Sequence, residues 1–358
     1  MAVGTRGRSR GVGTRDGARA RPGSAGARGL CPAAANGPPM APAEDDISID
    51  EKRVYAGSAG RTDAYVATGT GVVRVSLSAD KVGAFDMVAR DPARDVAVLA
   101  RDEGTADLVA AATPDGLSVA AVGDDPEFAP VDDDPAVAVG AAGGRDGAVG
   151  GRDGALLVAR GDGAVGGRDG ALLVARGDGA IERVEFEEAG TAVASATRLG
   201  AVSDPRAVDG SLVAAADGIF RIGEGGLTDV GLDDARDVAG AGMPLAATGA
   251  GLYWLGNGWM TVREGVADAV SADGDGHAMA VVDGDLLVHS GAGGEWGGEA
   301  WGVADLPVDE TVVALGYGPG VSVVVTEAGT LCVDAGDGWR HQVVGVRDVN
   351  GVALAVVE

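Results

Sequence analysis

The residues best suited to chemistry are an arginine and an aspartate that recur side by side. They form an Arg-Asp-Val core three times, at Arg94-Asp95-Val96, Arg236-Asp237-Val238 and Arg347-Asp348-Val349. A guanidinium beside a carboxylate can bind a small ion or a polar ligand through charge-assisted hydrogen bonds. The same pair can also be structural, with the aspartate capping backbone donors and the arginine pairing with a neighbouring element. The structural interpretation is favoured, and ligand binding is the alternative.

The histidines offer no second site. The chain has three, His277, His289 and His341, in different parts of the repeat pattern. A general base needs a partner within hydrogen-bond reach, and the sequence places none there. The loop 273–277, DGDGH, alternates carboxylates but lacks the third acid and the distal glutamate of a helix-loop cation site. We therefore predict no catalytic residue, no metal ligand and no cofactor.

Aromatic residues are concentrated in the C-terminal half of the chain. Trp296 and Trp301 lie in a glycine-rich stretch that interrupts the strand pattern. Large amphipathic side chains outside the repeat core are typical of contact surfaces. These two tryptophans are the pair predicted to contact a partner.

The elements that must position these residues are short β-strands. From Ile47 onward, short Val/Leu/Ala runs are bounded by Gly, Asp-Gly and Asn-Gly, and no helical periodicity is sustained. The clearest unit is 244–260, PLAATGAGLYWLGNGWM, with an Asn257-Gly258 turn suited to a two-residue hairpin loop. Seven such hairpins can be aligned on the glycines Gly71, Gly116, Gly179, Gly218, Gly251, Gly284 and Gly329.

This repeat predicts an all-β fold, a single β-propeller. The hairpin glycines are 33 to 47 residues apart once one insertion is set aside, which is the period of propeller blades. Seven blades are favoured over six or eight. The C-terminal residues 347–357 are predicted to close the ring beside the first hairpin, because an open ring leaves two unpaired edges. Closure by one strand or by two both remain open. The innermost strands would then bring Arg94/Asp95, Arg236/Asp237 and Arg347/Asp348 to one mouth of the axial channel.

A perfect duplication interrupts the third blade. Residues 147–162 are repeated without a mismatch as 163–178. Sixteen residues are too few for a blade, so only one copy can take the blade position. We expect the first copy to be displaced, because the second continues directly into the next strand. Each copy contains Arg-Gly-Asp, which we interpret as a turn rather than an adhesion motif.

The first 46 residues differ from the rest and are predicted to be a disordered extension rich in Arg, Gly, Ala and Pro. Residues 1–39 hold seven arginines and one acid. The preferred explanation is that translation begins at Met40, and a basic arm that tethers the protein to nucleic acid is the alternative if Met1 is the true start. The propeller is predicted to span 47–358.

The charge pattern points to a particular environment. The net charge is −26, with 39 Asp against 15 Glu and 26 Arg against 2 Lys. Acidic, lysine-poor surfaces resemble those of proteins from salt-in halophiles, where molar salt shortens the screening length to about 3 Å. Such a surface disfavours nucleic-acid binding, and no stretch reaches the length of a membrane helix. We expect a cytoplasmic monomer.

Three segments carry a family resemblance. Residues 51–62 (EKRVYAGSAGRT), 244–259 and 334–341 (DAGDGWRH) resemble a family of haloarchaeal β-propeller proteins. The resemblance covers about Ile47 to the C-terminus. It implies a propeller in a halophilic cytoplasm, but no activity and no catalytic residue. The N-terminal extension and the duplication depart from it.

The expected function is non-enzymatic. We predict a scaffold or ligand-sensing module that presents its channel mouth or one face to an unknown protein or small ligand. The alternative is a metal-dependent propeller hydrolase or lactonase. Such enzymes gather Glu, Asp, Asn and His at the channel, and this chain has three asparagines and one glutamine.

Overall fold

The repeating unit is a hairpin with a glycine at its turn, and in three blades a threonine hydroxyl before the turn closes it. The computed structural model describes residues 61–143, 170–223, 225–291 and 294–357. The hydroxyl groups of Thr68, Thr113 and Thr248 donate to the carbonyl oxygen three residues later, at 2.8, 2.8 and 3.0 Å. At Gly71, φ is 141° and a Cβ would lie 2.0 Å from the carbonyl oxygen of Ala89. Only glycine fits there, which explains the spacing seen in the sequence.

The strands form seven four-stranded antiparallel sheets, each running from an innermost strand at the axis to an outer strand. Blade one consists of β28 (Val349–Val357), β1 (Arg61–Thr68), β2 (Gly71–Ser78) and β3 (Lys81–Ala89). Blade two consists of β4 (Asp95–Leu99), β5 (Leu108–Thr113), β6 (Gly116–Ala121) and β7 (Ala129–Pro130). Blade three consists of β8 (Ala136–Ala142), β9 (Ala171–Arg176), β10 (Ala180–Phe186) and β11 (Val193–Ala201). Blade four consists of β12 (Pro205–Asp209), β13 (Leu212–Ala215), β14 (Gly218–Gly223) and β15 (Gly226–Gly231).

The remaining three sheets follow the same order. Blade five consists of β16 (Ala235–Ala239), β17 (Leu245–Thr248), β18 (Gly251–Leu255) and β19 (Trp259–Glu264). Blade six consists of β20 (Ala267–Ala272), β21 (His277–Val282), β22 (Asp285–Ser290) and β23 (Trp301–Val303), with the 3₁₀ helix η2 (Gly298–Ala300) before β23. Blade seven consists of β24 (Val312–Gly318), β25 (Val321–Thr326), β26 (Thr330–Asp334) and β27 (Arg340–Val343).

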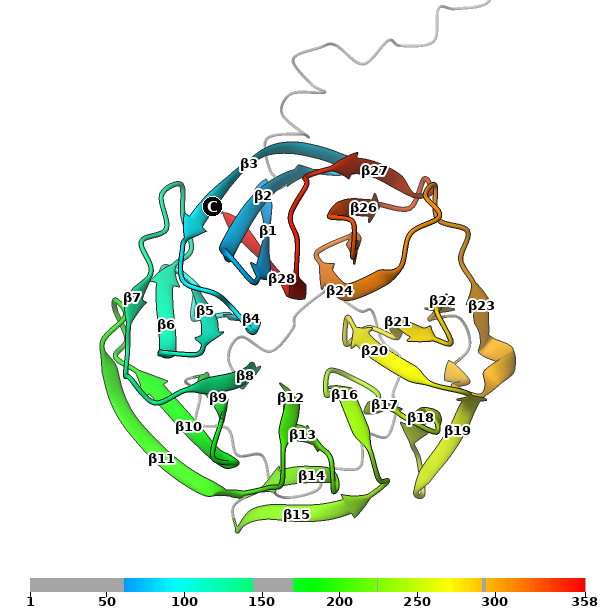
Figure 1. The fold of residues 1–358 in the computed structure, drawn as a ribbon, viewed down its shortest axis with the longest axis horizontal. Coiled ribbons are helices and arrows are strands. Elements are labelled where there is room, and N and C mark those ends of the chain that lie inside the picture. Colours follow the sequence, from blue (N-terminus) through cyan, green and yellow to red (C-terminus); the bar gives the residue numbers. More distant parts are fainter. Residues whose placement is uncertain (1–60, 144–169, 224, 292–293, 358) are drawn as a thin grey trace, which may run out of the picture. The chain divides into compact units, whose positions relative to one another are not determined.

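The blades close into a ring. Each innermost strand contacts the innermost strand of the next blade, from β28 through β4, β8, β12, β16 and β20 to β24 and back to β28 (Figure 1). The predicted seven-bladed propeller is therefore confirmed. Closure uses a single C-terminal strand, because β28 pairs antiparallel with β1 from Arg61↔Val357 to Thr68↔Val349.

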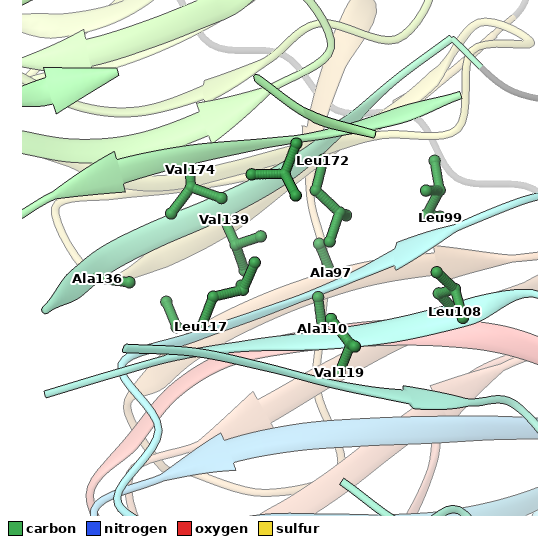
Figure 2. Close-up of a cluster of buried hydrophobic side chains, with 12 residues drawn as sticks. Ala97, Leu99, Leu108, Ala110, Leu117, Val119, Ala136, Val139, Leu172 and Val174 are labelled. Atoms are coloured by element: carbon green, nitrogen blue, oxygen red, sulfur yellow. The ribbon is translucent and has the colours of Figure 1, made fainter. Parts of the chain in front are cut away.

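The core lies between neighbouring blades. Figure 2 shows one such cluster, which contains Leu108 and Leu117 of blade two and Val139 and Leu172 of blade three. All four side chains are at most 2% exposed. Burying a leucine or valine side chain stabilises a fold by about 1.5–3 kcal/mol. In the described part of the chain, strands pair only within their own sheet, so these contacts between sheets help to hold the ring at a fixed geometry around its axis.

The second copy of the duplicated segment, residues 163–178, supplies the second strand of blade three. β9 (Ala171–Arg176) comes from that copy, as expected, whereas the first copy lies outside the described residues. Of the two Arg-Gly-Asp triplets, only 176–178 is described. It ends β9, and Asp178 accepts a hydrogen bond from the amide of Ala180 at 2.9 Å.

Removing residues 147–162 should therefore leave the fold intact, because the remaining copy still supplies β9. The melting temperature should stay the same or rise slightly, since each halving of a connection saves about 0.6 kcal/mol of closure entropy. Thermal unfolding followed by circular dichroism measures this. Loss of a cooperative transition would show that both copies are needed.

The predicted extension over residues 1–46 lies outside the described residues, which begin at Arg61. Within the described part of the chain, no helix has the length and hydropathy needed to cross a membrane.

Candidate functional site

The innermost strands enclose a cavity on the propeller axis. Its volume is about 400 Å³, and all seven blades contribute to its wall. Valine, alanine and leucine make up much of the lining. The residues with polar side chains are Arg94, Asp95, Arg206, Asp209, Arg236, Asp237, Asp268, Ser271, Tyr317 and Asn350.

A recurrent β-bulge presents one group of these residues. In six innermost strands the pairing skips the second residue, and the skipped residues are Asn350, Val137, Arg206, Arg236, Asp268 and Val313. A bulged residue leaves the strand ladder and its side chain is redirected. Arg94 stands just before β4, at the corresponding position of blade two. All innermost strands run in the same direction, so the six of these residues that line the cavity, all except Val137, surround one of its mouths, which we call the rim.

The three rim arginines differ in their partners. Arg206 pairs with Asp234 at 2.7 Å and with Asp204 at 3.5 Å. Arg236 pairs with Asp268 and lies 3.9 Å from Asp234. These contacts connect blades four, five and six through alternating charges, so the two guanidinium groups are neutralised.

Arg94 is the exception. Its side chain is exposed, and Nη1 donates to the carbonyl oxygen of Ala136 on blade three at 3.2 Å. Among the described residues, no carboxylate lies within ion-pair distance of it. On its other side, Asn350 of blade one donates to the carbonyl oxygen of Ala93 at 2.9 Å. The guanidinium therefore has donors to spare at the rim.

Asp95 and Asp237 each connect two blades. Asp95 accepts from its neighbour Val96 at 2.8 Å and from Val139 of blade three at 2.9 Å. Asp237 accepts from Val238 at 2.9 Å and from Val270 of blade six at 2.8 Å. Both thus cap backbone donors at a blade junction, which is the structural role considered from the sequence. Their place on the cavity wall leaves ligand binding as a further prediction.

A third carboxylate joins this pair. Asp209 is the last residue of β12 and accepts from the amide of Gly240 on blade five at 2.7 Å. Burial raises the pKa of Asp95 and of Asp237 to about 7, and the backbone donors partly oppose that rise. Burial likewise raises the pKa of Asp209. Asp209 and Asp237 also raise the pKa of Asp95 through their charge. The three carboxylates are therefore electrostatically coupled, and the charge of one changes the pKa of another.

Arg347 and Asp348 do not line the cavity. β28 begins one residue later, and its bulge falls at Asn350, so Asn350 and Gly351 occupy the positions held by Arg236 and Asp237 in blade five. Asp348 instead has φ at 53° and accepts the amide of Gly69 through its carbonyl oxygen at 2.8 Å. Blade one has the same Arg-Asp-Val core as blade five, but its arginine lies three residues before the bulge instead of at the bulge.

The opposite mouth holds a pair that the sequence interpretation missed. His277 Nδ1 lies 2.6 Å from Asp273 Oδ2, just after β20 ends. Asp273 also raises the pKa of Tyr317, although burial is the larger cause. The i, i+4 spacing within DGDGH is the signal that could have placed His277 beside a carboxylate. Within the described residues, no group of three or more His, Cys, Asp or Glu side chains could hold a metal ion.

Trp296 and Trp301 enclose a buried histidine. The His289 ring stacks on Trp296 with centroids 4.1 Å apart and an interplanar angle of 9°, and it lies 5.3 Å from Trp301. Trp296 is 7% exposed and belongs to the core between blades five and six. Trp301 is half-buried. A contact between this pair and a partner stays a prediction, and Trp301 has the larger exposed surface.

Comparison with known proteins identifies the fold. The family model Beta-prop_HVO_0234-like, beta propeller, matches residues 48–355. No curated protein matches the chain. A chain of the BBS1N–ARL6DN complex is similar at 12% identity with a TM-score of 0.51, over 78% of this chain and 89% of that one. Apo AztD from Citrobacter koseri is similar at 14% identity with a TM-score of 0.46, over 81% and 84%. At these identities the likeness extends to the fold alone.

Proposed function

Because the chain belongs to the HVO_0234-like β-propeller family, we propose that it works as a non-enzymatic binding module built on one propeller. Its ligand is small and polar and binds at the rim of the axial cavity. A cavity of about 400 Å³ lies within the range of small-molecule sites, which are roughly 300–1,000 Å³. Propeller axes also gather side chains from several blades at one place.

The observation that supports this function best is that Arg94 has guanidinium donors not used by an ion pair with any described residue. Its guanidinium is exposed at the rim, where the described residues offer it one backbone acceptor, whereas Arg206 and Arg236 are paired with carboxylates. A guanidinium offers five N–H donors in a fixed geometry. The donors that Arg94 does not use inside the protein are free to bind a polar ligand.

The cavity wall supports binding rather than turnover. Asp95 and Asp237 hold backbone amides of the next blade, so their positions are set by the ring. A hydrolase is the second candidate, and the Asp273–His277 pair at the opposite mouth favours it. A carboxylate that accepts the Nδ1 proton leaves Nε2 free to act as a general base.

We also propose a salt-rich cytoplasm as the setting and a monomer as the working form. The net charge of −26 and the scarcity of lysine support a surface adapted to high salt. The same charge disfavours nucleic acid as a partner.

Replacing Arg94 by alanine should weaken ligand binding about tenfold or more without unfolding the protein. A panel of small carboxylates, phosphates, amino acids and sugars would be added, at the lowest salt that keeps the protein folded, and thermal unfolding followed. A true ligand at 100 times its Kd stabilises by about 2.7 kcal/mol. Arg94→Ala should reduce this stabilisation to about 1.4 kcal/mol or less. Arg198→Ala, which changes an exposed arginine on the outer strand β11, should retain it.

Two results would contradict this function. Equal shifts in both variants would place the ligand elsewhere. Chemical conversion of a bound compound, lost in His277→Asn, would favour the hydrolase.

A further inference from the structure

We propose that the ligand of the rim is a zwitterion, a small molecule whose carboxylate binds Arg94 and whose ammonium group binds Asp95 and Asp237. This inference rests on the proposed function, since it names the ligand class of the same site. It follows from the order of charges along the axis, from the hydrogen bonds already formed, and from the size of the cavity.

The positive charge is at the entrance. Arg94 is at the rim, and its Nη1 bond to Ala136 at 3.2 Å is the contact that orients it. Nε and Nη2 on one edge of the guanidinium can bind both oxygens of one carboxylate. Arg206 and Arg236 supply less, because Asp234 and Asp268 already take their charge.

The negatively charged side chains lie one residue further along the innermost strands, deeper in the cavity than the rim. Asp95 and Asp237 directly follow Arg94 and Arg236, so their side chains begin about 3.3 Å deeper along the strand. They come from blades two and five, on different sides of the ring, and the charge of Asp237 acts on Asp95. Each oxygen of either carboxylate accepts one backbone amide. A carboxylate has about four acceptor sites, so each can still accept an ammonium proton from the cavity.

A ligand with a single charge fits this arrangement poorly. A simple anion at Arg94 would also meet the field of Asp95, Asp237 and Asp209. A simple cation between the carboxylates would leave Arg94 unpaired at the entrance. A zwitterion can pair with both kinds of charge: its ammonium group enters the cavity and binds the carboxylates, and its carboxylate stays at the rim and binds Arg94. A molecule of amino-acid size fits a cavity of about 400 Å³.

The pH dependence has a definite sign. Burial raises the pKa of Asp95 and of Asp237 to about 7, and the charged groups that act on Asp95 are Asp237 and Asp209. An ammonium group binds the ionised carboxylates, so affinity should rise as the pH passes upward through 7. For one such carboxylate the ionised fraction increases about tenfold between pH 6 and pH 8. Aliphatic amino acids keep both charges over this range, so the change reports on the protein.

The test uses ω-amino acids of increasing length, namely glycine, β-alanine, 4-aminobutyrate and 6-aminohexanoate, with acetate and methylammonium as single-charge probes. Calorimetric titration of the full-length protein should show one preferred length, bound at least about tenfold more tightly than either single-charge probe. Arg94→Ala should weaken that binding about tenfold or more. Asp237→Asn should do the same and reduce the rise between pH 6 and pH 8.

The outcomes separate this inference from the proposed function. Acetate binding as tightly as every amino acid, lost in Arg94→Ala, would overturn the zwitterion and retain the rim as a binding site. Binding of no member of the series would also overturn it, and the ligand panel would then decide the proposed function. Because Asp95 and Asp237 each hold an amide of the next blade, both Asp→Asn variants are measured, and cooperative thermal unfolding shows that each is folded. Normal binding by both would overturn the role of the carboxylates.

Discussion

A chain that ends at residue 345 should not form a stable propeller. The deletion removes β28, which pairs with β1 along its whole length and contacts both β4 and β24 (Figure 1). It leaves the inner edge of β1 unpaired and takes Leu354 and Ala355 out of the cores beside blade one. The lost free energy should equal the whole stability of a domain, on the order of 10 kcal/mol. Circular dichroism and thermal unfolding should show no cooperative transition.

The control keeps every strand and changes only where the ends lie. In a circular permutant, Glu358 is joined to Met1 and new ends are opened within residues 144–169, between β8 and β9. Residues 1–60 then connect β28 to β1, and the ring is closed in blade three instead. The permutant should unfold cooperatively. A truncated chain that melts near the parent temperature would show that closure by β28 is dispensable.

Arg176→Ala should be strongly destabilising. The Arg176 side chain is 6% exposed and joins blade two to blade three by holding Asp132 at 2.9 and 2.7 Å through both oxygens. It also holds Glu182 at 2.9 Å and the carbonyl oxygen of Asp134 at 2.8 Å. Removing one partner of a buried ion pair costs about 3–5 kcal/mol. The two carboxylates are about a quarter exposed and can rehydrate, so about 3 kcal/mol is expected.

The duplication supplies the matched control for this substitution. Arg160 stands in the same sixteen residues, but β9 contains Arg176. Arg160→Ala should therefore change the free energy of unfolding by less than about 0.5 kcal/mol. Denaturant titration of both variants at one salt concentration measures the difference. Equal losses would mean that both copies contribute to the fold.

Local sequence determined the architecture. Alternating apolar residues and turn glycines specify strands and hairpins within about ten residues, and the hairpin glycines mark where the third strand of a blade begins. Gly71, Gly116, Gly218 and Gly251 are the first residues of β2, β6, β14 and β18. Seven repeats of the unit, with one strand left at the C-terminus, were enough to predict a closed ring. Each of these features depends on neighbours in the chain.

Which residues line the cavity depends on the position of each Arg-Asp core within its innermost strand, and the sequence did not show that position. The Arg-Asp cores at 94 and 236 reach the cavity, whereas the identical core at 347 precedes its strand. Asp209 and Asp268 line the cavity without the core, because the strand face and the bulge place them there. One residue of shift moves a side chain to the other face of a strand.

The amino-acid sequence by itself predicted a β-propeller, with seven blades favoured, and determined an acidic, lysine-poor composition. Only the tertiary structure decided which charges meet. Asp95 and Asp237 are 142 positions apart, yet they act on each other across one axis. Strand formation is set by short-range backbone preferences. The field in the channel is instead a sum over blades brought together by ring closure, so it exists only once β28 has joined β1.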